Sequence, residues 1–124
     1  PYRRQRQMCI RDSDKVKNDR DQVIRFVEAM YAGSDFRNTD FDQNCQYAAD
    51  LTGLSIDSMT GSKLDADWVD AATIHELANN GEMLKYYEIQ QKNFLESGAI
   101  EEEVPVENYV HFDIMNEAYD AYIK

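Results

Sequence analysis

Residues 81–122 read GEMLKYYEIQQKNFLESGAIEEEVPVENYVHFDIMNEAYDAY and contain two helical patterns joined by an acidic connector. The first helix is predicted over residues 82–97, and Gly98 follows at the position where a left-handed residue ends a helix. Pro105 predicts an extended turn in the connector, because it disfavours helical backbone at Val104. A final helix is expected over residues 112–123. On the first of these helices, the side chains predicted to face inward are Met83, Leu84, Tyr87, Phe94 and Leu95, and those predicted to face outward are Gln90, Gln91, Lys92 and Glu96.

Two further helical patterns lie near the start of the chain. The first begins at Asn18 or Asp19, and the pair Gly33-Ser34 is predicted to end it. The second is expected to begin with Thr39 as its N-cap and to stop at Gly53. The side chains predicted for its inner face are Phe41, Cys45, Ala48 and Leu51.

The middle of the chain continues the helical pattern. Ser55 is expected to cap a single short turn, and residues 60–63 form the most loop-like passage. A further amphipathic helix is predicted after Asp65 or Asp67, with Trp68 on its apolar face and an end at residues 79–81. No strand-like alternation is evident, so the segment is predicted to be all-α, with about five helices.

Charge is distributed unevenly along the 124 residues. Residues 1–20 carry seven basic and three acidic side chains, whereas the rest carries six basic and 21 acidic ones, and the formal net charge is −11. Such an acidic body argues against nucleic acid as a partner, because that binding depends on Lys and Arg neutralising phosphates. No run approaches the roughly 18–20 apolar residues that a membrane span needs.

The first residues stand apart from the body. The sequence QMCIRDS at residues 7–13 resembles the translation of sequencing-adapter DNA, and residues 1–13 are predicted to be non-native. A basic arm for nucleic acid or a membrane is the alternative for this stretch. Excluding it removes Cys9 and leaves Cys45 alone in residues 14–124, where a single cysteine is more often a small buried hydrophobe than a reactive thiol.

Three segments carry a family resemblance. They are DQVIRFV at residues 21–27, DLTGLS at residues 50–55, and the elbow from Gly98 to Tyr109 with its Val-Pro-Val-Glu sequence. In their order and spacing they resemble the C-terminal part of the substrate-binding proteins of ABC importers for nitrate, sulfonates, taurine and thiamine-pyrimidine precursors. The resemblance covers roughly residues 19–122.

That resemblance implies a fold and a role. Residues 14–124 would be the C-terminal helical portion of an α/β protein with two lobes that close around a small anion or a pyrimidine precursor. The implied partners are this solute and a membrane permease, and the implied location is periplasmic or extracellular, with attachment to the membrane only through a lipid anchor or the permease. The family's enzymatic relatives use a cysteine-rich iron motif, which this chain does not contain.

Few individual residues suggest chemistry. No catalytic or cofactor motif is present, and His75 and His111 have no Cys or His at metal-ligand spacing. Catalytic residues, cofactors and a metal site are therefore not predicted, and the ligand-binding residues are unknown. Tyr86 and Tyr87 with Trp68 could line a ligand cleft, although their helical spacing favours core packing. The acidic run that begins at Glu101 is predicted to be a solvated loop, with a docking patch for a transporter subunit as the alternative.

A different class of protein also fits the composition. An acidic body with amphipathic helices and no catalytic constellation is compatible with a free-standing helical interaction module in the cytoplasm. The two hypotheses differ in self-sufficiency, because a fragment of a larger protein needs the rest of its lobe to bury its apolar faces.

Overall fold

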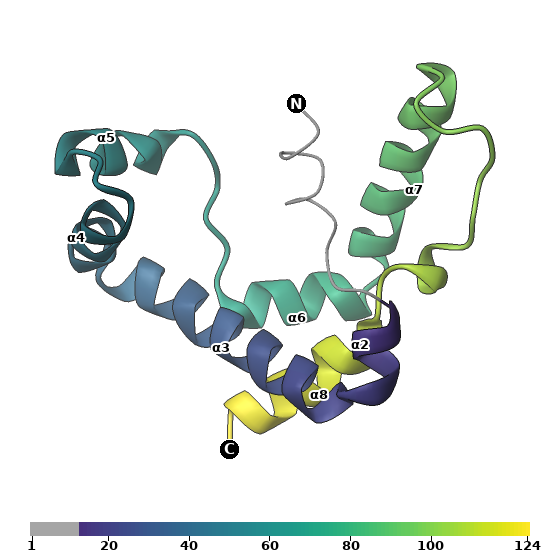
Figure 1. Cartoon of the computed structure of the whole chain (residues 1–124), viewed down its shortest axis with the longest axis horizontal. Coiled ribbons are helices and arrows are strands. Elements are labelled where there is room, and N and C mark those ends of the chain that lie inside the picture. The colour runs from purple at the N-terminus through teal and green to yellow at the C-terminus, as the bar shows by residue number, and fades with distance from the viewer. Residues whose placement is uncertain (1–12) are drawn as a thin grey trace.

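In the computed structural model, which describes residues 13–124, every regular element is helical (Figure 1). The all-α prediction is thereby confirmed for this part of the chain, and no helix in it is long and apolar enough to cross a membrane. The segment that was predicted to be non-native, residues 1–13, lies almost entirely outside the described residues. Cys9 lies within that segment and is likewise outside them. The elements are α2 (Ser13–Asn18), α3 (Arg20–Thr39), α4 (Phe41–Thr52), α5 (Ile56–Gly61), η1 (Ser62–Leu64), α6 (Ala71–Asn79), α7 (Glu82–Glu96), η2 (Val106–Asn108) and α8 (Phe112–Tyr122).

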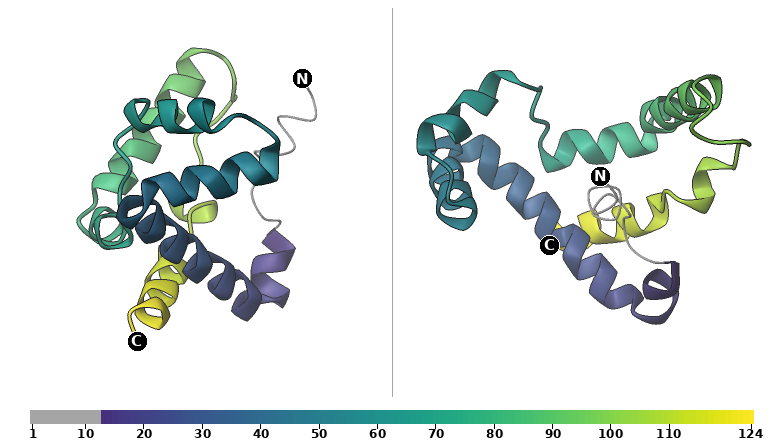
Figure 2. Two further views of the ribbon diagram at one scale, coloured as in Figure 1. Left: turned by 90° about the vertical axis from the view of Figure 1, so that its left-hand side faces the viewer. Right: turned by 45° about the horizontal axis from the view of Figure 1, so that its top comes forward.

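Helix α3 runs through the centre of the molecule, and the helix that it packs against most extensively is α8. Helix α6 lies against both, so that three helices meet although they are far apart in the sequence. Two arms extend from this centre, the α4–α5 pair at one end and α7 with its connector at the other (Figures 1 and 2). In Figure 1 and in the right view of Figure 2 the arms stand well apart from each other.

The core is small and lies where α3, α6 and α8 meet. Its fully packed members are Tyr31, Ala71 and Ala118, of which Ala118 has no exposed surface. The two alanines let the helices approach closely, since neither side chain extends beyond Cβ. Partly buried apolar side chains surround these three: Ile24, Val27, Ile74, Tyr119 and Tyr122.

Much apolar surface remains uncovered outside this core. No large side chain in the described part of the chain is fully buried, and Leu51 and Leu64 are 89% and 94% exposed. The predictions that Leu51 and Phe94 face inward are therefore wrong, because no helix covers their faces.

Local capping chemistry sets several helix ends as predicted. Ser55 accepts a hydrogen bond from the backbone of Ser58 and begins the short α5. Gly53 ends α4 with φ 71°, and Gly98 follows α7 with φ 72°, both in the left-handed region that glycine favours. Helix α8 occupies the range expected from its pattern.

The predicted break at Gly33-Ser34 is wrong, because α3 continues through it to Thr39. The hydroxyls of Ser34 and Thr39 donate to carbonyl oxygens four residues earlier, which is compatible with an intact helix. Asp40, and not Thr39, separates α3 from α4. Its backbone N–H donates to Phe36, and its side chain accepts from the backbone of Gln43, so one residue closes α3 and caps α4.

The helix predicted to include Trp68 begins later, at Ala71, with Asp70 as its N-cap. Trp68 and Val69 belong to the preceding segment, since their carbonyl groups accept hydrogen bonds from Asn38 and Arg37 of α3. The Arg37 guanidinium also lies over the Trp68 ring, 4.7 Å from its centroid. The hydrogen bond to Thr73 that caps α6 lowers the pKa of Asp70. The passage over residues 60–63, expected to be a loop, contains the end of α5 and the start of η1.

Two glycines give opposite expectations. We expect Gly33→Ala to stabilise the chain by about 0.5–1 kcal/mol, because an added methyl meets no atom within 4 Å and removes backbone freedom from the unfolded state. Gly53→Ala meets open space too, but its positive φ should make the change destabilising by about 1–2 kcal/mol. Urea unfolding followed by far-UV circular dichroism measures both changes. Destabilisation by Gly33→Ala would contradict a continuous α3.

Candidate functional site

A single carboxylate connects the three central helices. Asp35 of α3 accepts a hydrogen bond from the backbone N–H of Ala71 at 2.7 Å and from the hydroxyl of Tyr122 at 2.5 Å. Ala71 is the first residue of α6, so this carboxylate pairs an N–H that has no partner within its own helix. A negative charge at this position also interacts favourably with the helix dipole. Asp35 therefore fixes both α6 and α8 on α3.

Aromatic rings pack beside this carboxylate. Tyr31, only 3% exposed, meets Tyr119 edge-on at 5.6 Å and Tyr122 nearly parallel at 6.4 Å between ring centroids. Burial raises the pKa of Tyr31, whose hydroxyl donates to the carbonyl of Met115. His75 of α6 stacks on the far side of this group, with its ring 4.0 Å from that of Tyr119. The structure thus places His75 in a packing role.

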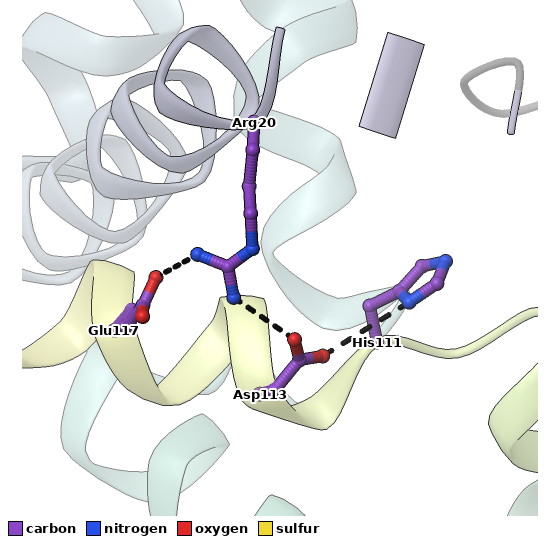
Figure 3. Close-up of polar contacts among 4 residues, drawn as sticks. All are labelled: Arg20, His111, Asp113 and Glu117. Carbon is purple, nitrogen blue, oxygen red and sulfur yellow. Dashed lines mark hydrogen bonds and ion pairs between the residues drawn. The ribbon is translucent and has the colours of Figure 1, made fainter. Parts of the chain in front are cut away.

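An ion-pair cluster attaches the start of α3 to α8 (Figure 3). The Arg20 guanidinium donates to Asp113 at 2.9 Å and, through its other terminal nitrogen, to Glu117. Partial desolvation acts to raise the pKa of Asp113, but the hydrogen bond and charge of Arg20 hold it below its ordinary value. His111 lies at the edge of the cluster, with Nδ1 4.0 Å from Asp113. Within residues 13–124, no three His, Cys, Asp or Glu side chains are grouped to hold a metal ion.

The connector after α7 is held by one buried amide. Gln91 is 8% exposed, although it was predicted to face outward. Its Oε1 accepts from the Val104 backbone N–H at 2.6 Å, and its Nε2 donates to the Val104 carbonyl at 3.0 Å. The side chain therefore pairs with the extended backbone as a neighbouring strand would. This pairing buries Gln91, which corrects the prediction.

The α7–connector groove is an open hollow of about 550 Å³ between these two segments. A smaller apolar hollow of about 190 Å³ also borders Gln91 and Val104, and Tyr87 and Tyr109 line it with their rings 6.1 Å apart. The residues that line the α7–connector groove are Leu84, Glu88, Ile89, Gln91 and Lys92 of α7 and Glu103, Val104, Pro105, Val106 and Glu107 of the connector.

The aromatic side chains suggested for a ligand cleft are not brought together. Trp68 packs on Arg37 beside α3, whereas Tyr87 packs on Tyr109 next to the connector. Tyr86 is 59% exposed. Trp68 is 39% exposed. The prediction that all three form core is therefore wrong for Tyr86 and Trp68, and only partly met by the half-buried Tyr87. Cys45, in contrast, is buried as expected.

The most connected polar residues were not identified from the sequence. Asp35 and Arg20 each lie within an ordinary amphipathic pattern, and their partners on α8 are 87 or more positions away in the sequence. The only local signal was the acidic N-terminal turn of α8, where Asp113 lies. Gln91 is a polar residue between the apolar positions of α7, so the sequence pattern did not indicate that its side chain is buried.

The connector clamp can be tested by comparing neighbouring glutamines. We expect Gln91→Leu to accelerate amide hydrogen exchange at Val104 about tenfold, which corresponds to losing roughly 1.4 kcal/mol of local hydrogen bonding. Gln90→Leu is the matched control, since Gln90 is exposed and the side chain that bonds Val104 is that of Gln91. Equal exchange rates in the two variants would mean that Gln91 does not hold the connector.

The Asp35–Tyr122 bond predicts alkaline sensitivity. The hydrogen bond that the Tyr122 hydroxyl donates to Asp35 raises the pKa of Tyr122 in the folded chain, and partial burial adds to this effect. The bond therefore contributes fully below the unfolded value of about 10 and is lost as the pH rises through the higher folded value. We expect the melting temperature to fall as the pH rises above about 10, and Tyr122→Phe to reduce this fall. Tyr86→Phe, at an exposed ring, should leave the pH dependence unchanged.

Comparisons of the chain with family models, curated proteins and solved structures gave no match. What the chain does is therefore inferred from its own residues, their geometry and the sequence resemblance.

Proposed function

We propose that residues 14–124 are the C-terminal helical portion of a solute-binding protein that delivers a small anion or a pyrimidine precursor to an ABC importer. The helices would support the first of two lobes and would carry no chemistry of their own. Solute capture would occur by hinge closure of the lobes, followed by docking on a membrane permease. The protein would then act outside the cytoplasmic membrane.

The order of elements at the C-terminus supports this proposal. The left-handed stop at Gly98, the extended connector with Pro105 and the terminal helix α8 follow one another as the resemblance implies. The junction at Gly53 and Ser55 likewise ends one helix and begins another. Each of these features is set by residues close together in the sequence. Each can therefore follow the family pattern without contacts from the rest of the protein.

The observation that carries the proposal is the uncovered apolar surface. Helix α7 exposes Ile89 and Phe94 by 57% and 46%, and the α4–α5 arm exposes Leu54 and Ile56 by 56% and 45%. Such faces normally pack against another layer of secondary structure. The sheet of a first lobe would supply that layer in a solute-binding protein.

One observation favours the rival function, a free-standing acidic interaction module. The core between α3, α6 and α8, together with the Asp35 and Arg20 contacts, is built entirely from this chain. A module of this kind would use its exposed apolar faces to bind another protein. The two functions therefore share the same open surface and differ in what covers it.

Expression of residues 14–124 alone distinguishes them. For a part of a larger lobe, we expect a helical far-UV signal together with binding of an apolar dye and few dispersed amide resonances outside the central core. Joining the segment to the upstream coding sequence should abolish dye binding. A sharp two-state melt with fully dispersed resonances would instead support the rival.

Resequencing the source DNA upstream of residue 14 provides the independent control. A reading frame that continues through alternating strand and helix patterns to a signal peptide would support the importer assignment. A genuine start codon and ribosome-binding site just before Lys15 would overturn it.

A further inference from the structure

The α7–connector groove has two walls that are held together and a lining whose charged side chains are mostly acidic. Its two walls are a helix and an extended segment, and the paired hydrogen bonds of Gln91 with Val104 hold them together. A volume of about 550 Å³ is within the range of protein binding sites. Hydrogen bonds within this chain therefore hold the two walls of the groove together.

Apolar surface is available inside the groove. Ile89 of α7 is 57% exposed and Val104 of the connector is 41% exposed, and both line it. Pro105 adds a rigid apolar face on the connector side. An occupant with apolar side chains would remove this surface from water, which is the main favourable term in most protein associations.

The charge around this apolar surface selects the kind of occupant. Glu88, Glu103 and Glu107 line the groove, and among residues 13–124 Lys92 is the one basic side chain in its lining. Glu101 and Glu102 continue the acidic run next to it, in a chain whose formal net charge is −11. Electrostatic complementarity therefore favours a cationic occupant and disfavours nucleic acids and anionic membranes.

We propose that the α7–connector groove docks a cationic, amphipathic segment of a partner protein. Apolar side chains of that segment would pack on Ile89 and Val104, and its Lys or Arg side chains would pair with Glu88, Glu103 and Glu107. The inference rests on the groove alone and is independent of the importer assignment. It stands equally for a solute-binding protein and for a free-standing module.

The test uses the full chain and two synthetic peptides of the same amphipathic pattern, one of Leu and Lys and one of Leu and Glu. Fluorescence anisotropy of the labelled peptides measures binding. We expect saturable binding of the Leu/Lys peptide that weakens as salt is added, because exposed charge pairs are screened. Comparable binding of the Leu/Glu peptide, or no saturable binding of the Leu/Lys peptide, would overturn the proposal.

Charge-matched variants locate the site. The triple variant E88Q/E103Q/E107Q should weaken binding about tenfold at low salt, since each rim pair contributes a modest factor. The control variant D42N/D50N/D57N changes the net charge equally at exposed positions on the α4–α5 arm. It should alter the affinity by less than about threefold. Equal weakening by the two variants would show attraction to overall charge and would overturn the assignment to this groove.

Two uncharged substitutions separate the apolar contact from the charge. Ile89→Ser should weaken binding of the Leu/Lys peptide while leaving its salt dependence unchanged. Gln91→Leu should also weaken it, because release of Val104 removes one wall of the groove. Far-UV circular dichroism checks that each variant keeps its helices. Unchanged affinity in both variants would overturn the proposed position of the peptide.

Discussion

The arrangement of this chain depends on the Asp35 carboxylate, which bonds to a backbone N–H of α6 and to a hydroxyl of α8 from its place on α3. Arg20, near the other end of the same helix, pairs with Asp113 and Glu117. Helix α8 is thus attached to α3 at two points and runs in the same general direction. The small side chains of Ala71 and Ala118 allow the close contact that these polar bonds require.

The small size of this core leaves both arms exposed to solvent. A core built around alanines and edge-packed tyrosines buries little apolar area, and the burial of apolar area is the dominant favourable term in folding. The α4–α5 arm and α7 therefore gain little from the centre and present apolar side chains to solvent. The pairing of Gln91 with Val104 and the packing of Tyr87 on Tyr109 hold the connector against α7. A covering surface is what the importer proposal and the interaction-module alternative have in common.

At the proposed docking surface, charge would select the partner. The acidic side chains along the connector and α7 are solvated, and they limit which partners can approach the apolar faces between them. His75 stacks on Tyr119 and His111 lies at the edge of an ion pair, so the imidazoles of both residues have structural surroundings.

The sequence by itself determined the helical class, the helix ends at Gly53, Ser55 and Gly98, and the extended backbone at Pro105. Each of these signals acts through backbone conformation or a hydrogen bond within a few residues, so neighbouring letters suffice to read it. Only the tertiary structure decided that α3 runs through Gly33, that Gln91 is buried and that Leu51 is exposed. Burial depends on which distant segment covers a helix face, and the partners of Asp35 and Arg20 on α8 lie more than 80 residues away along the chain. Local periodicity marks an apolar face, but it does not specify what packs against it.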